Sequence, residues 1–564
     1  MPPIMDMPRL TVEDVLTQIR LKPPAVQQLA MAAFYQRYPQ LRTQAAVFRR
    51  QPEDEPIFEA CRWDVARFAR EFFPHLCPIP FSTMHDDFFA QYATDAGARG
   101  LRDATAAPRV FAKTTIIGKI KILHDCVYQH ERYIVILSSR DELAIDKVKD
   151  VRTELETNTR LLAVYGPQQG SFWNMGDFIT SQGVEVRAAA RGSQVRGLLR
   201  GPVRPSKIVL DDSENAELVL TEAQRRKTWD WFAEDIAKLG DEQTNIEVIG
   251  TLLHEDSLLA KLLKNPGYRA RRYQAVLSFA DASAVPLWQQ WRTLFLDLDN
   301  PTHQADARAF FEAHEAAMLL GTAVLWPERY DYYRLMVERL VDGDFAFWKE
   351  RQNEPKRAGD TLFDMDRAGY CSLTPDRLTR RDGCVVLFTQ LVDLVAFWDP
   401  AIGQGDSPVW SACGVLGKDA SGYLYALDAY ISQGASPTDQ VNGVVDLLCR
   451  WQVRRFGWEA NQFQSLHGGN IETALAQRAL EDGQAYKPIF VPITNTRNKM
   501  LRISTLEPLV TNRHLWFNQA LPSEFLRQMT VFRPVDGADK DDAPDSLEGS
   551  VRVMKHVAER RIPR

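Results

Sequence analysis

Long apolar runs, paired cysteines and an excess of positive charge are all missing from this sequence. No stretch approaches the roughly 20 apolar residues of a membrane-spanning helix, and the opening residues MPPIMDMPRLTVEDVL lack the basic-then-apolar pattern of a signal peptide. The seven cysteines form no CxxC pair, which argues against a disulfide framework. A net charge of -6 argues against a generally basic nucleic-acid coat. We therefore expect a cytoplasmic protein that does not enter membranes and whose contacts with DNA, if it makes them, are local.

The length of 564 residues exceeds the size at which one hydrophobic core keeps growing, so we expect several domains. Short apolar runs such as YIVIL, KIVL and IEVIG alternate with polar helical stretches, which predicts a mostly parallel α/β sheet. Later, LVDLVAFWDPA, WSACGVLG and YLYALDAYI predict a second α/β domain with an antiparallel start. The predicted regions are a helical N-terminal region (1–75), the first α/β domain (76–265), a helical linker or lid subdomain (266–385), the second α/β domain (386–550) and a basic tail (551–564).

The stretch APRVFAKTT has the spacing of the phosphate-binding loop G-x-x-x-x-G-K-[ST], but alanines replace both glycines. In such a loop, backbone N–H groups at a helix start hold phosphate oxygens, Lys113 reaches the outer phosphates and the Thr114 hydroxyl binds Mg²⁺. Taken alone, the stretch is more simply explained as a basic helix start on a surface. The nucleotide-binding residues predicted from the loop are Ala107, Pro108, Arg109, Val110, Phe111, Ala112, Lys113, Thr114 and Thr115.

An acidic pair after a buried strand favours the nucleotide interpretation. In PSKIVLDDSENAE, Asp211 follows an apolar strand, at the position where a carboxylate for the Mg²⁺ ion of bound ATP belongs. Asp212 or Glu214 would orient and deprotonate the attacking water, and the sequence does not choose between them. The next strand, IEVIG, ends beside Thr251, which is positioned to sense the γ-phosphate. Two acids in a turn could instead cap the next helix.

A second set of acids lies in the C-terminal domain. Asp399 ends an apolar strand, Glu459 lies in FGWEANQF, and ADKDDAPDSLEGSV presents Asp541, Asp542 and Asp545 before a helix. A two-metal nuclease needs such a cluster, because two Mg²⁺ or Mn²⁺ ions roughly 3.5 to 4 Å apart activate water and stabilise the leaving oxygen. Each acid alone is more simply explained as a helix cap or a surface charge.

The order of these motifs resembles that of the tailed-bacteriophage terminase large subunit. APRVFAKTT, YIVILSS, VRAAARGSQVRGLLRG, IVLDD and VIGTLLHEDSLL follow one another as in that family, and the resemblance covers roughly residues 80 to 550. It implies an ASCE-type P-loop ATPase domain followed by an RNase H-like nuclease domain. Two departures stand out: Val110 replaces a common glycine, and Asp212 replaces a common glutamate.

The resemblance also implies roles for particular residues. Asp399, Glu459 and Asp541 would be the nuclease metal ligands, with Asp545 as the alternative third ligand. Arg109 is the preferred arginine for stabilising charge on the γ-phosphate. The other candidates for that role are Arg191, Arg196, Arg200 and Arg204, while Asp542 and Asp406 would support the nuclease ligands. Arg497, Lys499 and Arg502 in NTRNKMLRI would position phosphates, or form a solvated basic turn.

The family further implies cofactors and partners. ATP with Mg²⁺ would serve the first site, and two Mg²⁺ or Mn²⁺ ions the second. The partners would be double-stranded DNA, a portal on a procapsid and a small terminase subunit, with a homo-oligomeric ring forming on the portal in the host cell cytoplasm. Two alternatives stay open: a helicase-nuclease of DNA repair or phage defence, and a capsid-docking or DNA-scaffold subunit that does not hydrolyse ATP.

Overall fold

The computed structural model describes residue 48 and residues 50–190, 203–355, 361–400, 409–459, 465–495, 498–534 and 541–556. Predictions on most of the N-terminal region, on the end of the basic tail, and on Arg191, Arg196, Arg200, Asp406 and Arg497 lie outside the described residues. The chain divides into two compact units. The first comprises Met1–Leu277, Val324–Asp331 and Lys349–Pro355, and the second comprises Ser278–Ala323, Tyr332–Trp348 and Lys356–Arg564. The predicted linker, residues 266–385, is thus shared between them.

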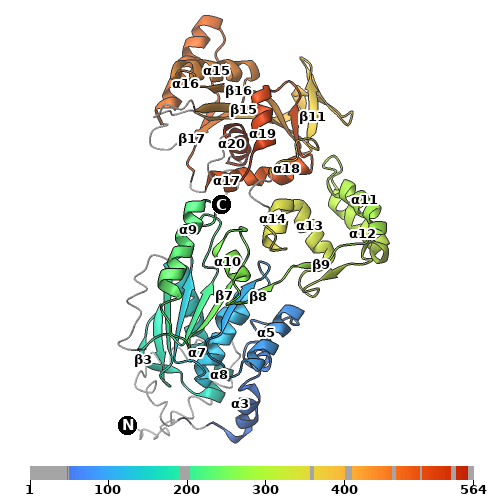
Figure 1. The fold of residues 1–564 in the computed structure, drawn as a ribbon. Coiled ribbons are helices and arrows are strands. Elements are labelled where there is room, and N and C mark those ends of the chain that lie inside the picture. Colours follow the sequence, from blue (N-terminus) through green and yellow to red (C-terminus); the bar gives the residue numbers. More distant parts are fainter. Residues whose placement is uncertain are drawn as a thin grey trace, which may run out of the picture. The chain divides into compact units, whose positions relative to one another are not determined.

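In the part of the first unit that is described, eight strands form one sheet in the order β3-β4-β5-β2-β6-β7-β1-β8 (Figure 1). Their bounds are β1 (Arg102–Ala106), β2 (Tyr133–Ser138), β3 (Gln169–Trp173), β4 (Asp177–Thr180), β5 (Glu185–Ala190), β6 (Lys207–Asp211), β7 (Asn245–Gly250) and β8 (Arg269–Arg272). In this sheet order, the six strands β5-β2-β6-β7-β1-β8 are parallel to one another. Strand β4 runs antiparallel to both of its neighbours, β3 and β5. With β7 inserted between β1 and β6, this is the strand order of ASCE-type P-loop ATPases, so the predicted fold class is confirmed.

Helices cover both faces of this sheet, which explains why its central strands are continuously apolar. Apolar side chains of α9, η5 and α10 share a core with alternate residues of β1, β2, β6 and β7, while α7 contacts β2 and β5. The helices of this unit are η2 (Pro52–Asp54), α3 (Glu55–Cys61), α4 (Val65–Phe72), α5 (Thr83–Thr94), η3 (Thr114–Ile120), α6 (Lys121–Tyr128), α7 (Asp141–Thr157), α8 (Thr159–Tyr165), α9 (Glu222–Trp231), η5 (Phe232–Ile236) and α10 (Leu258–Lys264).

Strand β8 differs from the expectation of a helical region after residue 265. Its sequence, RARR, has no apolar alternation, and its side chains are largely exposed. Backbone pairing with β1 holds it at the sheet edge, and Arg269 pairs with Asp103 and Asp95 at 2.7 Å. An edge strand that is stabilised by ion pairs has no hydrophobic sequence pattern from which it could be predicted.

The second unit has a nine-stranded sheet within its described residues, in the order β13-β12-β11-β19-β16-β15-β14-β17-β18. β14 pairs antiparallel with β15, and β15 with β16, whereas β14, β17 and β18 are parallel. This order and these directions are those of an RNase H-like sheet, as predicted. The strands are β11 (Gly369–Leu373), β12 (Arg377–Arg380), β13 (Val385–Leu387), β14 (Leu391–Asp399), β15 (Trp410–Asp419), β16 (Leu424–Gln433), β17 (Arg455–Glu459), β18 (Ile489–Ile493) and β19 (Leu515–Asn518).

Strands β11 to β13 were not expected, because residues 266–385 read as helical. β11 pairs with β19, more than a hundred residues later, so its place in the sheet depends on a distant partner. Two helices, α15 and α16, pack on one core of this sheet, and α20 lies along β14 and β15. The helices are η6 (Ala282–Ala284), α11 (Val285–Phe295), α12 (His303–Met318), α13 (Tyr332–Asp342), η7 (Phe388–Gln390), α15 (Pro437–Trp451), α16 (Ser465–Asp482), α17 (Lys499–Ile503), η8 (Ser504–Leu506), α18 (Glu507–Thr511), α19 (Ser523–Val531) and α20 (Asp542–His556).

Three short elements, β9 (Val276–Ser278), β10 (Ala323–Val324) and α14 (Asp344–Glu350), lie where the chain passes between the units. No helix among the described residues has the length and apolar character needed to cross a membrane.

Candidate functional sites

The phosphate loop joins β1 to η3 and adopts a left-handed backbone at two positions. Val110 has a φ of 67° and Ala112 a φ of 56°, a region that glycine enters readily and a β-branched residue does not. Between them, Phe111 is fully buried and stacks on Tyr330 at a centroid distance of 4.9 Å. His85 Nε2 donates a hydrogen bond to the Phe111 carbonyl at 2.9 Å. The packing of Phe111 thus stabilises the left-handed backbone at Val110 and Ala112, a conformation that glycine adopts more readily.

The end of β7 contacts the base of the loop. Ala107 and Pro108 are buried there, and the Ala107 N–H donates to the Gly250 carbonyl at 3.0 Å. Thr251 Oγ1 lies 3.5 Å from the Ala107 carbonyl. A movement of the end of β7 would therefore be transmitted directly to the loop through these contacts.

Lys113 and Thr114 lie where the loop enters η3, and both side chains reach neighbouring strand ends. Lys113 is buried, and its Nζ lies 3.4 Å from Thr251 Oγ1 and 3.7 Å from Asp212 Oδ1. Thr114 Oγ1 donates a hydrogen bond to Asp211 Oδ1 at 2.9 Å. A buried ammonium beside the N–H groups of a helix start is well suited to an anionic phosphate.

Asp211 is completely buried and is held by Lys147 of α7, a residue that the motifs did not identify. Lys147 Nζ lies 2.9 Å from Asp211 Oδ2 and donates to the Asp211 carbonyl at 2.5 Å. Gly118 of η3 permits this approach, because a Cβ there would lie 2.9 Å from Asp211 Oδ2. Burial raises the pKa of Asp211. The charge of Lys147 opposes this rise, and the charge of Asp212 adds to it. The periodicity of α7 gives no signal that distinguishes Lys147 from Lys149, the other lysine of this helix.

The structure separates the two acids between which the sequence could not choose. Glu214 Oε1 accepts the N–H of Leu258 at 2.7 Å, and Oε2 accepts that of Leu259 at 3.1 Å, so Glu214 caps α10. Burial raises the pKa of Glu214, and these backbone hydrogen bonds oppose the rise. Asp212 has a φ of 48°, and its half-exposed side chain faces Lys113.

The candidate arginines make other contacts in this structure. Arg109 Nη1 lies 3.1 Å from Glu350 Oε1, and the Arg109 N–H donates to the Glu350 carbonyl at 2.9 Å. Arg351 donates to the Arg109 carbonyl at 2.5 Å. Arg204 donates to the backbone carbonyls of residues 238–240. Arg109 is therefore at the loop, but engaged in an ion pair.

A cavity of about 290 Å³ adjoins the loop. Its position next to Lys113 leaves room for the base and sugar of a nucleotide whose phosphates meet the loop. The residues that line it include Cys77, Pro78, Phe81, Val110, Ala112, Lys113, Thr114, Thr115, Asp212 and Arg329.

In the second unit, acids from three elements converge at one sheet edge. Asp399 ends β14, Glu459 ends β17, and Asp545 lies in the first turn of α20. One carboxylate oxygen from each lies within 4.8 Å of the others. Because β14 and β17 pair in parallel, Asp399 and Glu459 reach the same edge. Oxygen ligands at this spacing fit Mg²⁺ or Mn²⁺.

A close helix–strand contact sets the position of Asp545. Gly549 lies against Phe397, where a Cβ would overlap the ring. Asp545 precedes Gly549 by four residues, about 6 Å along a helix. Asp399 follows Phe397 by two residues, about 6.6 Å along a strand. The two spacings match, so the contact at Gly549 brings Asp545 to Asp399.

Lys499 of α17 bridges the acids. Its Nζ lies 3.0 Å from Asp399 Oδ2, 3.1 Å from Asp541 Oδ1 and 3.4 Å from Asp545 Oδ2. Burial raises the pKa of Asp399 to about 7, with Lys499 opposing the rise and Asp545 adding to it. Unlike a solvated basic turn, Lys499 is thus part of the acidic cluster.

The start of α20 supplies three acids in different settings. Asp545 is buried, and its Oδ1 accepts a hydrogen bond from Arg502 at 2.9 Å. Asp541 contacts Lys499 and lies outside the group of three close carboxylates. Burial raises the pKa of Asp542 to about 6. The geometry groups Asp399 and Glu459 with Asp545, the alternative that the sequence had left as second choice.

No protein-family model and no curated protein matches the chain. Among solved structures, it is similar to the large terminase of the thermophilic bacteriophage D6E in complex with ATP-gamma-S, with 8% identity and a TM-score of 0.44 over 84% of this chain and 100% of that one. It is also similar to the human cytomegalovirus terminase nuclease domain (12% identity, TM-score 0.25, 30% of this chain, 86% of that one). A third is the large terminase nuclease of the thermophilic phage G20c (15% identity, TM-score 0.22, 34% and 98%).

Proposed function

We propose that the chain is a DNA-packaging motor subunit, a terminase large subunit that hydrolyses ATP to move double-stranded DNA into a procapsid and cuts the concatemer. The observation that carries this proposal is the presence of two sites in one chain. A phosphate loop with a buried lysine lies on an ASCE-type sheet, and a carboxylate cluster lies on an RNase H-like sheet.

In the first site, we assign phosphate binding to Lys113 and the loop N–H groups. Thr114 and Asp211 would hold Mg²⁺, which would neutralise charge on the phosphates. We assign the proton-accepting role to Asp212, because both oxygens of Glu214 already accept backbone N–H groups. Glu214 would instead link the acid strand to α10, so that a change at the nucleotide moves this helix.

In the second site, Asp399, Glu459 and Asp545 would hold two divalent cations, which would activate water and stabilise the leaving oxygen of a phosphodiester. Lys499 contributes positive charge where the cations bind, and we assign it the role of balancing the acids and contacting the DNA phosphate. Arg502 holds Asp545 in place.

The partners proposed are double-stranded DNA, a portal-bearing procapsid and a small terminase subunit, with a ring of copies on the portal in the host cytoplasm. A packaging assay tests this: purified procapsids, linear DNA and ATP are mixed with the protein, and DNA protected from added nuclease is measured. Protection that requires hydrolysable ATP is expected.

Two outcomes would overturn the proposal. Unwinding of a forked duplex without procapsids, together with no protected DNA, would favour a helicase-nuclease. Absence of phosphate release with Mg²⁺, DNA and all partners present would favour a capsid-docking or scaffold subunit. The Lys227→Ala variant, altered at an exposed position on α9, is the matched control and should package like the parent chain.

A further inference from the structure

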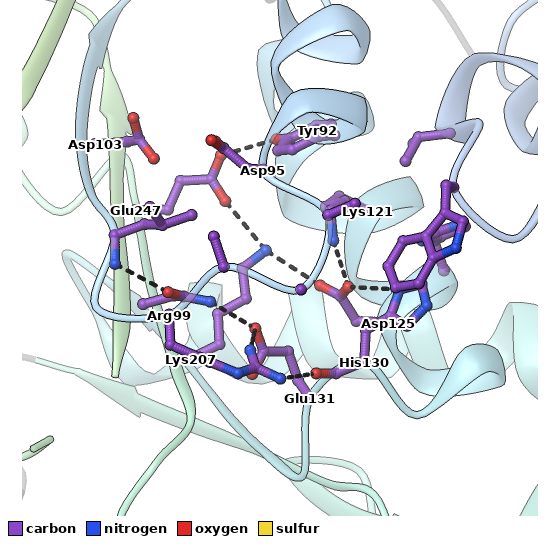
Figure 2. Close-up of a pocket in the computed structure, with 18 of the residues that line it drawn as sticks. Tyr92, Asp95, Arg99, Asp103, Lys121, Asp125, His130, Glu131, Lys207 and Glu247 are labelled. Atoms are coloured by element: carbon purple, nitrogen blue, oxygen red, sulfur yellow. Dashed lines mark hydrogen bonds and ion pairs between the residues drawn. The ribbon is translucent and has the colours of Figure 1, made fainter. Parts of the chain in front are cut away.

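A second cavity of about 290 Å³ lies at the opposite end of the first sheet from the nucleotide site. It is lined by residues at the start of parallel strands, including Lys207 of β6 and Asn245 of β7. The phosphate loop, by contrast, meets the strand ends at Asp211 and Thr251. Figure 2 shows charged side chains gathered in this cavity, with Asp125 between Lys121, Lys207 and His130. None of the proposed ATPase or nuclease steps uses these groups.

Three potential ligands come together here from one helix and the turn after it. His124 and Asp125 belong to α6, and His130 follows its left-handed cap at Gln129. One ligand atom from each of His124, Asp125 and His130 lies within 4.8 Å of the other two. His130 Nδ1 is 3.9 Å from Asp125 Oδ1, and the two imidazole centroids are 5.0 Å apart.

The hydrogen bond of His124 fixes which of its nitrogens can bind a ligand. His124 Nε2 lies 2.9 Å from the Cys61 carbonyl, which can only accept, so Nε2 carries the proton. Nδ1 is then a bare lone pair, and it is buried without a hydrogen-bond partner. Histidines that bind metals commonly donate their other N–H to a backbone carbonyl, which orients the ring.

His130 is also held in place, by stacking on Trp63 at a centroid distance of 4.3 Å and an interplanar angle of 1°. Burial lowers the pKa of His124 to about 3 and that of His130 to about 4. Neutral imidazoles need lose no proton to bind a metal.

We propose that His124, Asp125 and His130 form a zinc site that is separate from both enzymatic sites. Two imidazoles and one carboxylate are a common three-residue set for Zn²⁺, with a water completing the tetrahedron. Ligand atoms in such a site lie roughly 3.4 Å apart, so side-chain rotation has to bring these three closer. The bound ion would fasten the end of α6 to α3 through the His124–Cys61 hydrogen bond.

A lysine competes for the same carboxylate. Lys121 donates a hydrogen bond to Asp125 Oδ1, and Lys207 Nζ lies 3.2 Å from Oδ2. The zinc ion and the Lys121 ammonium are therefore alternative cations for one oxygen. This competition gives the proposal a signed test, because removing Lys121 should strengthen zinc binding, whereas removing an imidazole should abolish it.

The experiment measures zinc bound to the full chain by equilibrium dialysis, with Asp399→Asn and Glu459→Gln introduced to disable the nuclease cluster. One equivalent of zinc is expected. His130→Gln, at a turn position that is half-buried, should lose it, and His314→Ala, on the exposed surface of α12, should keep it. Lys121→Met should tighten binding by roughly tenfold, which corresponds to about 1.4 kcal/mol.

Cobalt provides an independent measurement, since tetrahedral Co²⁺ bound to imidazole absorbs strongly in the visible and octahedral Co²⁺ does not. Circular dichroism verifies that each variant is folded. The proposal is wrong if the folded background chain binds no zinc, if His130→Gln retains the full equivalent, or if Lys121→Met weakens binding.

Discussion

The two candidate sites both place a lysine among carboxylates, yet with a different charge balance. In the first unit, Lys113 is 3.7 Å from Asp212, while Asp211 is already paired with Lys147. In the second unit, Lys499 lies within 3.4 Å of three carboxylates, and Arg502 also pairs with Asp545. The two lysines and two aspartates of the first site balance in charge, and the ammonium of Lys113 borders a cavity, whereas the second site keeps an excess of negative charge.

This difference indicates what each site attracts. A cavity edged by a buried ammonium and backbone N–H groups favours an anion such as a nucleotide phosphate. A set of acids that Lys499 and Arg502 together do not neutralise favours divalent cations. Similar residue types would therefore suit ligands of opposite charge, and the pairing of each acid decides which charge each site favours.

The largest effect is expected from removing the lysine of the first site, which should impair that site and leave the second one active. Lys113→Ala should lower ATP turnover by about 10²–10³-fold, because the loop loses the charge that stabilises the outer phosphates. Steady-state phosphate release measures this, with Lys227→Ala as control. Cleavage of plasmid DNA in Mn²⁺ should continue at the parent rate. Unaltered ATP turnover would remove Lys113 from the nucleotide site.

The reciprocal change is Asp399→Asn. Loss of a ligand charge should reduce Mn²⁺-dependent plasmid cleavage by at least about 100-fold, with ATP turnover unchanged. Asp366→Asn, at an exposed position of the same unit, should cleave normally. If Asp399→Asn cleaves as fast as the parent chain, the metal cluster lies elsewhere.

A smaller effect is expected from Gly549→Ala, which tests how α20 is positioned. The added Cβ would overlap Phe397, and overpacking of this kind costs about 1–3 kcal/mol. Urea unfolding should report the loss of stability, and cleavage should fall because Asp545 moves away from Asp399. Lys555→Ala, on the exposed side of α20, should change neither. Full stability and full cleavage in Gly549→Ala would contradict the register argument.

The smallest effect is on pH dependence without metal. Burial raises the pKa of Asp399 from 3.8 to about 7, so the folded state binds this proton more tightly than the unfolded state. The resulting contribution to the unfolding free energy therefore decreases as pH rises from about 4 to about 7. The asparagine of Asp399→Asn cannot ionise. The Tm of this variant in EDTA, measured relative to that of the parent chain, should therefore increase as pH rises across this window. A Tm difference that is flat or shrinks with rising pH would refute this.

Much of the fold followed from local patterns. YIVIL, KIVL and IEVIG predicted buried parallel strands, and helices do cover both sheet faces, whereas the ATPase-type sheet was implied by the family resemblance. β8 and β11 were missed because they are fixed by partner strands, one through ion pairs and one across more than a hundred residues. The sequence pattern of such strands carries little apolar alternation.

The sequence by itself identified the strand ends that carry the candidate site acids, since Asp211 and Asp399 each end an apolar run. Tertiary structure decided the rest. Burial of Phe111 holds Val110 and Ala112 in a glycine-like backbone. Contacts between elements distant in the sequence bring Lys147, Lys499 and Asp545 into their sites. A contact of the same kind lets Glu214 cap α10. Spacing along a chain encodes the local turn, whereas charge pairing depends on which helix packs beside it.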